Sequence, residues 1–95
     1  MQKRTFILCD PDNSYVNRFM NYSQRRANFP FRVRGFTKGE GVAAYLEGGS
    51  AEAALIAWSL WMEWEEDLRQ KVQEMVPCVM LLTEDRRSGQ MDMTT

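Results

Sequence analysis

Short strand-like segments alternate with segments of helical periodicity along this chain of 95 residues. Such alternation favours a parallel sheet whose two faces are covered by helices. Right-handed crossovers between parallel strands then leave few topologies. The sequence therefore predicts an α/β fold with three layers, with strands expected at residues 5–9, 31–36, 51–58 and 76–82.

The expected strands differ in how they should be buried. Residues 5–9 and 76–82 are nearly continuous apolar runs, which are typical of strands covered on both faces. Residues 31–36 instead alternate apolar and polar side chains, which suits an edge strand with one face in water. Arg32 and Arg34 project to the same side of that strand, either as a solvated face or as a patch for a docking partner.

Three helices are expected between these strands. The first, at residues 14–27, follows side chains that can cap a helix and ends before a proline. The second lies within residues 37–49 and stops at a pair of glycines. The third covers residues 59–75, where apolar side chains recur at helical spacing. The members of that stripe are Trp61, Trp64, Leu68, Val72 and Met75.

The composition excludes several classes of function. The net charge of −1 argues against a general nucleic-acid binder, which usually carries a strongly basic face. The chain contains no histidine, which excludes serine–histidine and cysteine–histidine catalysis and histidine metal sites. Neither a signal-peptide core nor a membrane-spanning run is visible, so we expect a cytoplasmic domain without membrane insertion. Cys9 and Cys78 lie in apolar runs and are expected to be buried, reduced thiols.

The stretch FILCDPDN places Asp10 and Asp12 directly after the first expected strand. Ligand sites in parallel α/β sheets lie at the carboxyl ends of the strands. Three interpretations of the two acids are open: a polar strand end with helix capping, a weak divalent-cation site, and a phosphorylation pocket. Trp58 and Ser59, at the end of the third expected strand, and Thr83, after the fourth, are expected at the same edge of the sheet.

The stretch FILCDPDNSYVNRF, a third strand rich in small residues, and PCVMLLTE at the fourth strand together resemble a response-regulator receiver domain. The resemblance covers about residues 5–85. It implies a flavodoxin-like sheet in the order 2-1-3-4-5, and phosphoryl transfer from a histidine kinase to an aspartate after the third strand, as in two-component signalling. The fifth strand is expected to be missing or outside this chain. The prediction is a receiver-like domain over residues 1–85, in the order 2-1-3-4, and a polar tail or truncated helix over residues 86–95.

This sequence matches only some of the residues that form the pocket of a receiver domain. Asp10 resembles the first metal-binding acid, Pro11 stands where the second acid belongs, and Asp12 follows one place later. Thr83 resembles the hydroxyl residue of the pocket. The resemblance therefore implies a weak or vestigial Mg²⁺ site at Asp10 and Asp12, and no other cofactor.

No aspartate stands at the position that the resemblance implies for the phosphoacceptor, where the sequence offers Ala57, Trp58 or Ser59. Metal-assisted phosphoryl transfer to a receiver needs a carboxylate nucleophile within reach of the ion. A serine hydroxyl would need an activating base that the sequence does not obviously provide. We therefore predict no catalytic residue and no enzyme activity.

Among receivers with a degraded acid pocket, the chain is most similar to the N-terminal receiver-like domain of Tad pilus-assembly ATPases, which helps with self-association and localisation. No G-x-x-x-x-G-K-[ST] motif is present. The prediction is a non-catalytic bacterial interaction or regulatory domain of a longer signalling or localisation protein, which forms a homodimer or docks a protein partner. The alternative is a phosphorylatable receiver of a phosphorelay with a displaced acceptor.

Three tryptophans in WSLWMEW are interaction candidates beside the two arginines. Trp58, Trp61 and Trp64 recur every three residues, so they drift around a helix. Either two of them pack the helix onto the sheet, or one is exposed as an interface anchor. A further hypothesis is that these indoles fill the space that Mg²⁺ and phosphate would occupy in a receiver.

Overall fold

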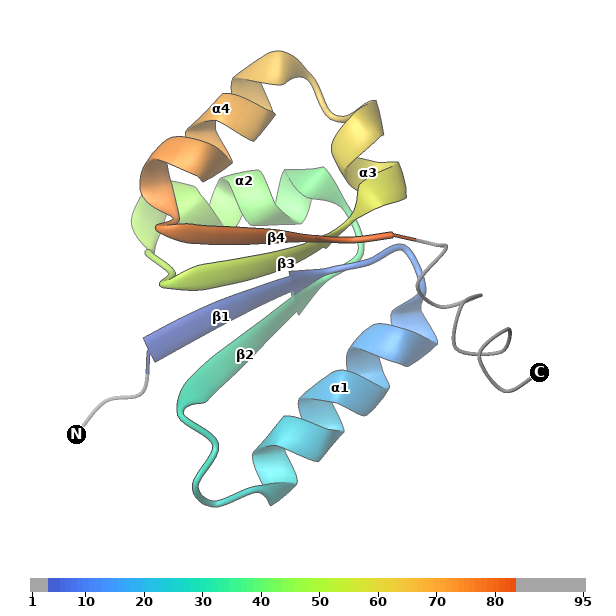
Figure 1. The fold of residues 1–95 in the computed structure, drawn as a ribbon, viewed down its shortest axis with the longest axis vertical. Coiled ribbons are helices and arrows are strands. Elements are labelled where there is room, and N and C mark those ends of the chain that lie inside the picture. The colour runs from blue at the N-terminus through green and yellow to red at the C-terminus, as the bar shows by residue number, and fades with distance from the viewer. Residues whose placement is uncertain (1–3, 84–95) are drawn as a thin grey trace.

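Four parallel strands form one sheet in the order β2-β1-β3-β4 (Figure 1). The computed structural model describes residues 4–83 of the chain. The strands are β1 (Arg4–Cys9), β2 (Phe31–Phe36), β3 (Ala53–Ala57) and β4 (Cys78–Leu82). The helices are α1 (Asn13–Arg25), α2 (Gly39–Gly48), α3 (Trp58–Glu63) and α4 (Glu66–Met75). The predicted α/β class and the strand order 2-1-3-4 are confirmed, and the arrangement agrees with a flavodoxin-like fold of three layers.

The helices cover the two faces of the sheet unequally. α1 lies on one face, and α2, α3 and α4 lie on the other (Figure 1). Alternate residues of β1 supply both cores, because successive side chains of a strand point to opposite faces. Ile7 and Cys9 pack with α2, α3 and α4, whereas Phe6 and Leu8 pack with α1. β1 is therefore the central strand that both helix layers share.

The helix expected over residues 59–75 is interrupted. α3 ends at Glu63 and α4 begins at Glu66, because Trp64 and Glu65 have extended backbone, with ψ of 147° and 154°. The stripe of apolar spacing persists across this break, and Trp61, Trp64 and Val72 are all buried. Met75, at the end of the expected stripe, is 39% exposed instead.

Cys78 was predicted to be buried, and this prediction is wrong. β4 is an edge strand whose side chains alternate between exposed and partly buried positions up to Leu82. Val79 and Leu81 face the core that α3 and α4 cover, whereas Cys78 and Met80 face the side on which α1 lies. α1 packs on β2, so it leaves the β4 end of that face open within the described residues. The apolar run 76–82 is thus covered on one face more than on the other.

A glycine allows the first turn of α2 to pack against the break between α3 and α4. A Cβ built on Gly39 would lie 2.7 Å from Cε2 of Trp64 and 2.9 Å from Cδ2 of Leu68. At the other end of α2, a Cβ on Gly48 would meet nothing within 4 Å. Gly48 and Gly49 do end this helix as predicted, but without positive φ, so the stop does not use a left-handed cap.

These two glycines give a matched test of the packing. We expect Gly39→Ala to lower the free energy of unfolding by about 1–3 kcal/mol, because the added methyl group overpacks the contact with the indole. Gly48→Ala should leave it unchanged or raise it by up to about 1 kcal/mol, because alanine is the better helix former. Urea unfolding followed by circular dichroism measures both. An equal effect of the two substitutions would contradict the packing described here.

Candidate functional site at the carboxyl edge of the sheet

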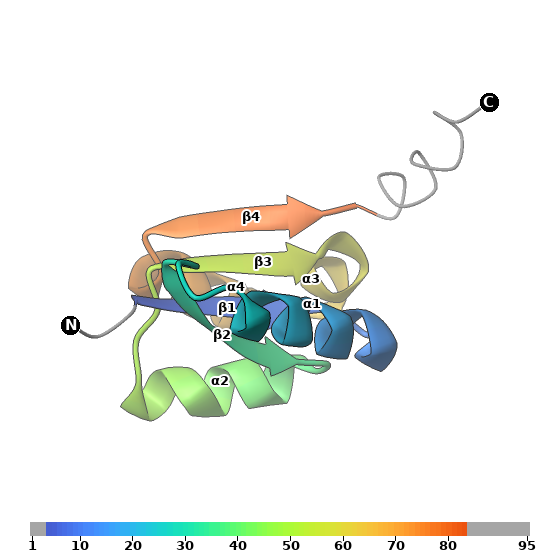
Figure 2. The ribbon, with the colours of Figure 1, turned by 90° about the horizontal axis from the view of Figure 1, so that it is seen from below.

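The carboxyl ends of three strands lie level at one edge of the sheet. β1 pairs with β3 up to Cys9 and Ile56, and β3 pairs with β4 up to Ala57 and Leu82. All strands run in the same direction, so Asp10, Trp58 and Thr83 follow at this edge (Figure 2). The structure thus brings together the residues that the sequence placed at the carboxyl ends of β1, β3 and β4.

Asp10 is completely buried at the end of the central strand. Its Oδ1 accepts a hydrogen bond of 2.8 Å from the backbone N–H of Asp12. Its own backbone N–H donates to the carbonyl oxygen of Phe36 over 3.0 Å, which ties the end of β1 to the end of β2. Hydrogen bonding to backbone groups is what allows a carboxyl side chain to lie out of water. Asp10 therefore fixes the turn between β1 and α1, and its role as a cation ligand stays a prediction.

Asp12 is exposed and caps α1. Its Oδ1 accepts hydrogen bonds from the backbone N–H groups of Ser14, at 3.0 Å, and Tyr15, at 3.3 Å. The first amides of a helix have no partner within the helix, and a carboxylate there also interacts favourably with the helix dipole. The capping interpretation of Asp12 is confirmed. One side chain of the acid pair is buried and the other is on the surface.

The end of β3 offers an apolar side chain where a receiver carries its phosphoacceptor. Ala57 is buried, and Trp58 begins α3 with 43% of its surface exposed. Ser59 lies within the first turn of α3, and the capping position of this helix is occupied by Ala57. The hypothesis that indoles fill the phosphate space stays open for Trp58, because Trp61 and Trp64 point into the core.

Trp61 and Trp64 form the part of the aromatic cluster that packs on the sheet. Both are buried, and their rings lie 5.9 Å apart between centroids at 51°. Aromatic pairs at such separations and tilts are favourable beyond the area that they bury. Two of the three tryptophans therefore pack, as one interpretation predicted, and Trp58 is exposed. The role of Trp58 as an interface anchor stays a prediction.

Arg32 and Arg34 lie away from this edge. Both are exposed on β2, and Arg34 is level with Ile7 in the middle of β1. They line a shallow cavity with residues of α1, of which Ser23 is buried and donates to the carbonyl oxygen of Met20. The arginine patch is therefore separate from the acids and tryptophans of the carboxyl edge.

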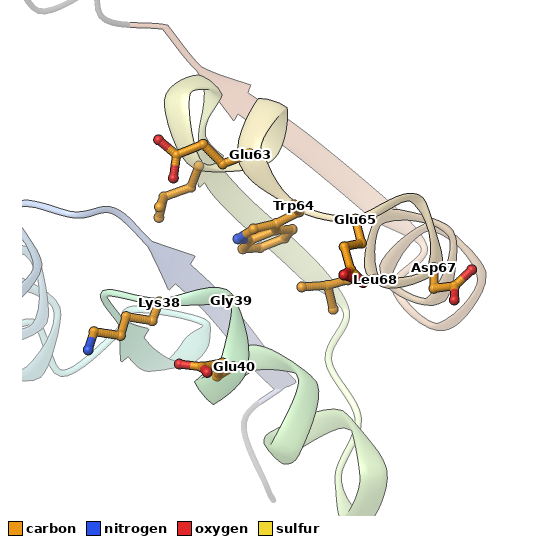
Figure 3. Close-up of a pocket in the computed structure, with 9 residues that line it drawn as sticks. Lys38, Gly39, Glu40, Glu63, Trp64, Glu65, Asp67 and Leu68 are labelled. Atoms are coloured by element: carbon orange, nitrogen blue, oxygen red, sulfur yellow. The ribbon is translucent and has the colours of Figure 1, made fainter.

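A cavity that the sequence did not indicate lies between the start of α2 and the junction of α3 with α4 (Figure 3). Its volume is about 550 Å³. Its lining residues are Lys38, Gly39, Glu40, Leu60, Glu63, Trp64, Glu65, Asp67 and Leu68. The acidic run EWEED at residues 63–67 was the available signal. Only Glu66 and Asp67 of this run lie in the first turn of α4.

Comparison with protein-family models, with curated proteins and with solved structures finds no match for this chain. Within residues 4–83, no group of three or more histidine, cysteine, aspartate or glutamate side chains could hold a metal ion. Across the same residues, no helix has the length and apolar character needed to cross a membrane. The geometry of the chain itself therefore carries the functional interpretation.

The cap on α1 can be tested by substitution. We expect Asp12→Ala to lower the free energy of unfolding by about 1 kcal/mol, because two helix amides lose their acceptor. Asp12→Asn should lose much less, because the amide oxygen can accept the same bonds. Chemical denaturation of the three proteins measures the difference. A loss of equal size in both variants would assign the stabilisation to the negative charge rather than to the hydrogen bonds.

Cys9 gives a prediction on pH. Burial, with a smaller effect of the neighbouring Asp10 carboxylate, raises the pKa of the Cys9 thiol from 9.0 to about 12. As the pH rises above 9.0, the unfolded chain loses this proton first, so the free energy of unfolding should fall by up to about 1.4 kcal/mol per pH unit. Cys9→Ala should remove this part of the decline. Urea unfolding at pH values on either side of 9.0 compares the two chains.

Thiol labelling provides the control for this prediction. Cys78 is exposed and should react with a thiol reagent in the folded protein, whereas Cys9 should react after unfolding. Rapid labelling of a folded Cys78→Ala variant would contradict the burial of Cys9.

Proposed function

We propose that this chain is a non-catalytic, receiver-like domain that acts by binding protein, either a second copy of itself or a partner. The observation that carries this proposal is the exposure of large apolar side chains on α3, α4 and β4. Trp58, Met62, Met75 and Met80 are each between 39% and 55% exposed. Tyr22, the other large apolar residue exposed among residues 4–83, lies on α1 under the guanidinium of Arg26.

These four side chains have the chemistry of a protein interface. Tryptophan and methionine are enriched at interfaces, and tryptophan is among the residues that contribute most to binding energy. Single exposed apolar side chains are ordinary on a protein surface, but several on neighbouring elements indicate an interaction surface. α3 and α4, which carry Trp58, Met62 and Met75, both contact β4, and Met80 lies on β4 itself and faces the side on which α1 lies.

The two edges of the sheet differ in a way that favours docking at β4. β4 reads CVMLL and has no charged side chain, whereas β2 carries Arg32 and Arg34. Charged residues on an edge strand discourage pairing with another strand, and an uncharged edge invites it. In an antiparallel self-pair of β2 centred on Val33, Arg32 of each copy would oppose Arg34 of the other, which is unfavourable. β4 is therefore the edge at which self-association or strand pairing with a partner would take place.

The receiver resemblance supports the regulatory part of the proposal. The parallel sheet in the order β2-β1-β3-β4, Asp10 at the end of β1 and Thr83 after β4 all suit that resemblance. Ala57 at the end of β3 suits a receiver that works without phosphate. We extend the proposal to a bacterial, cytoplasmic role in signalling or pilus assembly, as the similarity to the Tad proteins implies.

Self-association tests the proposal directly. We expect the average mass from light scattering to rise with protein concentration, and Met80→Lys to reduce that rise severalfold, because a charge on the β4 edge opposes pairing. Tyr22→Lys is the matched control, since it places the same charge on an exposed apolar position of α1, and it should leave the rise unchanged.

The opposite results are equally clear. A strictly monomeric chain at all concentrations, or an equal response to Met80→Lys and Tyr22→Lys, would count against an interface at β4.

Incubation with acetyl phosphate, followed by intact-mass measurement, tests the alternative function. A stable phosphoryl adduct on Asp10 or Asp12 would replace the proposal with a phosphorylated receiver whose acceptor is displaced.

A further inference from the structure

We propose that the cavity between α2 and the α3–α4 junction binds a basic side chain, arginine or lysine, of a peptide segment in a partner protein. This inference goes beyond the apolar surface described above, because none of Trp58, Met62, Met75 and Met80 lines the cavity. It rests on three observations: the charge of the rim, the apolar floor, and an indole N–H that lacks an acceptor.

The rim of the cavity is strongly acidic. Glu40, Glu63, Glu65 and Asp67 contribute carboxylates, and Lys38 contributes the opposing charge. In Figure 3 the carboxylates of Glu40 and Glu63 lie on opposite sides of the Trp64 ring, and that of Asp67 points away from it. A cation placed between Glu40 and Glu63 would interact favourably with both carboxylates. Charge complementarity thus selects a positively charged ligand.

The floor of the cavity is apolar. Leu60, Trp64 and Leu68 supply the apolar part of the lining, and the volume of about 550 Å³ is that of a small-ligand site. Arginine and lysine carry their charge on a stem of methylene groups, which packs along apolar surface while the charged group stays at the polar rim. A small inorganic cation would leave the apolar floor unused. The shape and lining therefore favour a long basic side chain.

The indole N–H of Trp64 supplies the third observation. Trp64 is 8% exposed, so more than nine-tenths of the side chain is buried. A Cβ built on Gly39 would meet its Nε1 before any other atom, so the N–H lies over the start of α2 at the cavity. Among residues 4–83 this N–H donates no hydrogen bond. The nitrogen is not among the buried polar atoms that lack a partner, so it is accessible to solvent, and a ligand at the cavity could provide an acceptor for it.

The combination of acceptor and cation identifies a peptide. The carboxylates favour a ligand with a positive charge, and the indole N–H favours one with an acceptor close to that charge. A peptide residue with a basic side chain carries both, since its backbone carbonyl oxygen accepts while its side chain is cationic. A polyamine carries the charge without an acceptor, so it would leave the indole N–H unsatisfied. The response of the Trp64 indole N–H therefore distinguishes a bound peptide from a bound polyamine.

Nuclear magnetic resonance of the whole chain tests the proposal. The probe is the capped tripeptide acetyl-Gly-Arg-Gly-amide, titrated into the uniformly ¹⁵N-labelled protein. We expect a saturable shift of the Trp64 indole N–H resonance, assigned by its loss in Trp64→Phe. The peptide with citrulline in place of arginine keeps the shape without the charge, and it should bind several times more weakly.

Substitutions on the rim and elsewhere on α2 locate the binding. The double variant Glu40→Gln with Glu63→Gln should weaken the arginine peptide about three- to tenfold, as expected for two exposed ion pairs. Glu47→Gln is the control, because Glu47 is exposed on α2 away from the cavity. It should leave the affinity unchanged. Trp64→Phe keeps an aromatic floor and should weaken the peptide by removing the donor.

Several results would overturn the proposal. These are no shift of the Trp64 resonance, equal binding of the citrulline peptide, an equal effect of Glu47→Gln, or the same indole shift with spermidine. Met80→Lys should leave the titration unchanged. If the chain is monomeric and still binds the peptide, the proposal for the cavity is supported and self-association at β4 is rejected. If the chain self-associates and does not bind the peptide, only the proposal for the cavity is rejected.

Discussion

Burial of β1 on both faces is the constraint on which the rest of the structure depends. Ile7, Leu8 and Cys9 are wholly inaccessible to water, and each apolar face of the strand needs its own layer of helices. The chain meets this requirement with α1 on one side and α2, α3 and α4 on the other. The strand ends at Asp10, whose buried carboxylate accepts from the backbone N–H of Asp12 in the turn to α1. Asp12 in turn accepts from the first free amides of that helix.

The unequal helix layers explain where the molecule is open. One helix covers the face of Phe6 and Leu8, and it packs on the β2 side of the sheet. The β4 side of this face therefore keeps apolar side chains in contact with solvent, Met80 among them. The same asymmetry makes Cys78 an exposed thiol and Cys9 a buried one, although both stand in similar apolar runs. The apolar composition of a segment is visible in the sequence, whereas the burial of its side chains depends on which helix covers them in the fold.

The sequence predicted the strands well, because runs of apolar side chains are a strong local signal. Crossover rules alone leave several topologies open, and the order of the strands was implied by the receiver resemblance. The sequence did not predict the break at Trp64 and Glu65. Apolar residues at helical spacing indicate which side chains meet the core, and two short helices at an angle can present the same side chains as one long helix. The break places Trp64 over Gly39, a contact between segments far apart in the sequence, and the acidic cavity follows from that contact.

α3 joins the two surfaces to which we assign binding. It is six residues long, with exposed Trp58 at its start and Glu63 at its end. Between them, Trp61 packs against Trp64, which lines the cavity. A ligand that contacts Trp64 therefore contacts the aromatic pair that fixes α3 on the sheet. The short helix thus contributes to both surfaces, with Trp58 and Met62 in the exposed apolar set and Leu60 and Glu63 in the lining of the cavity.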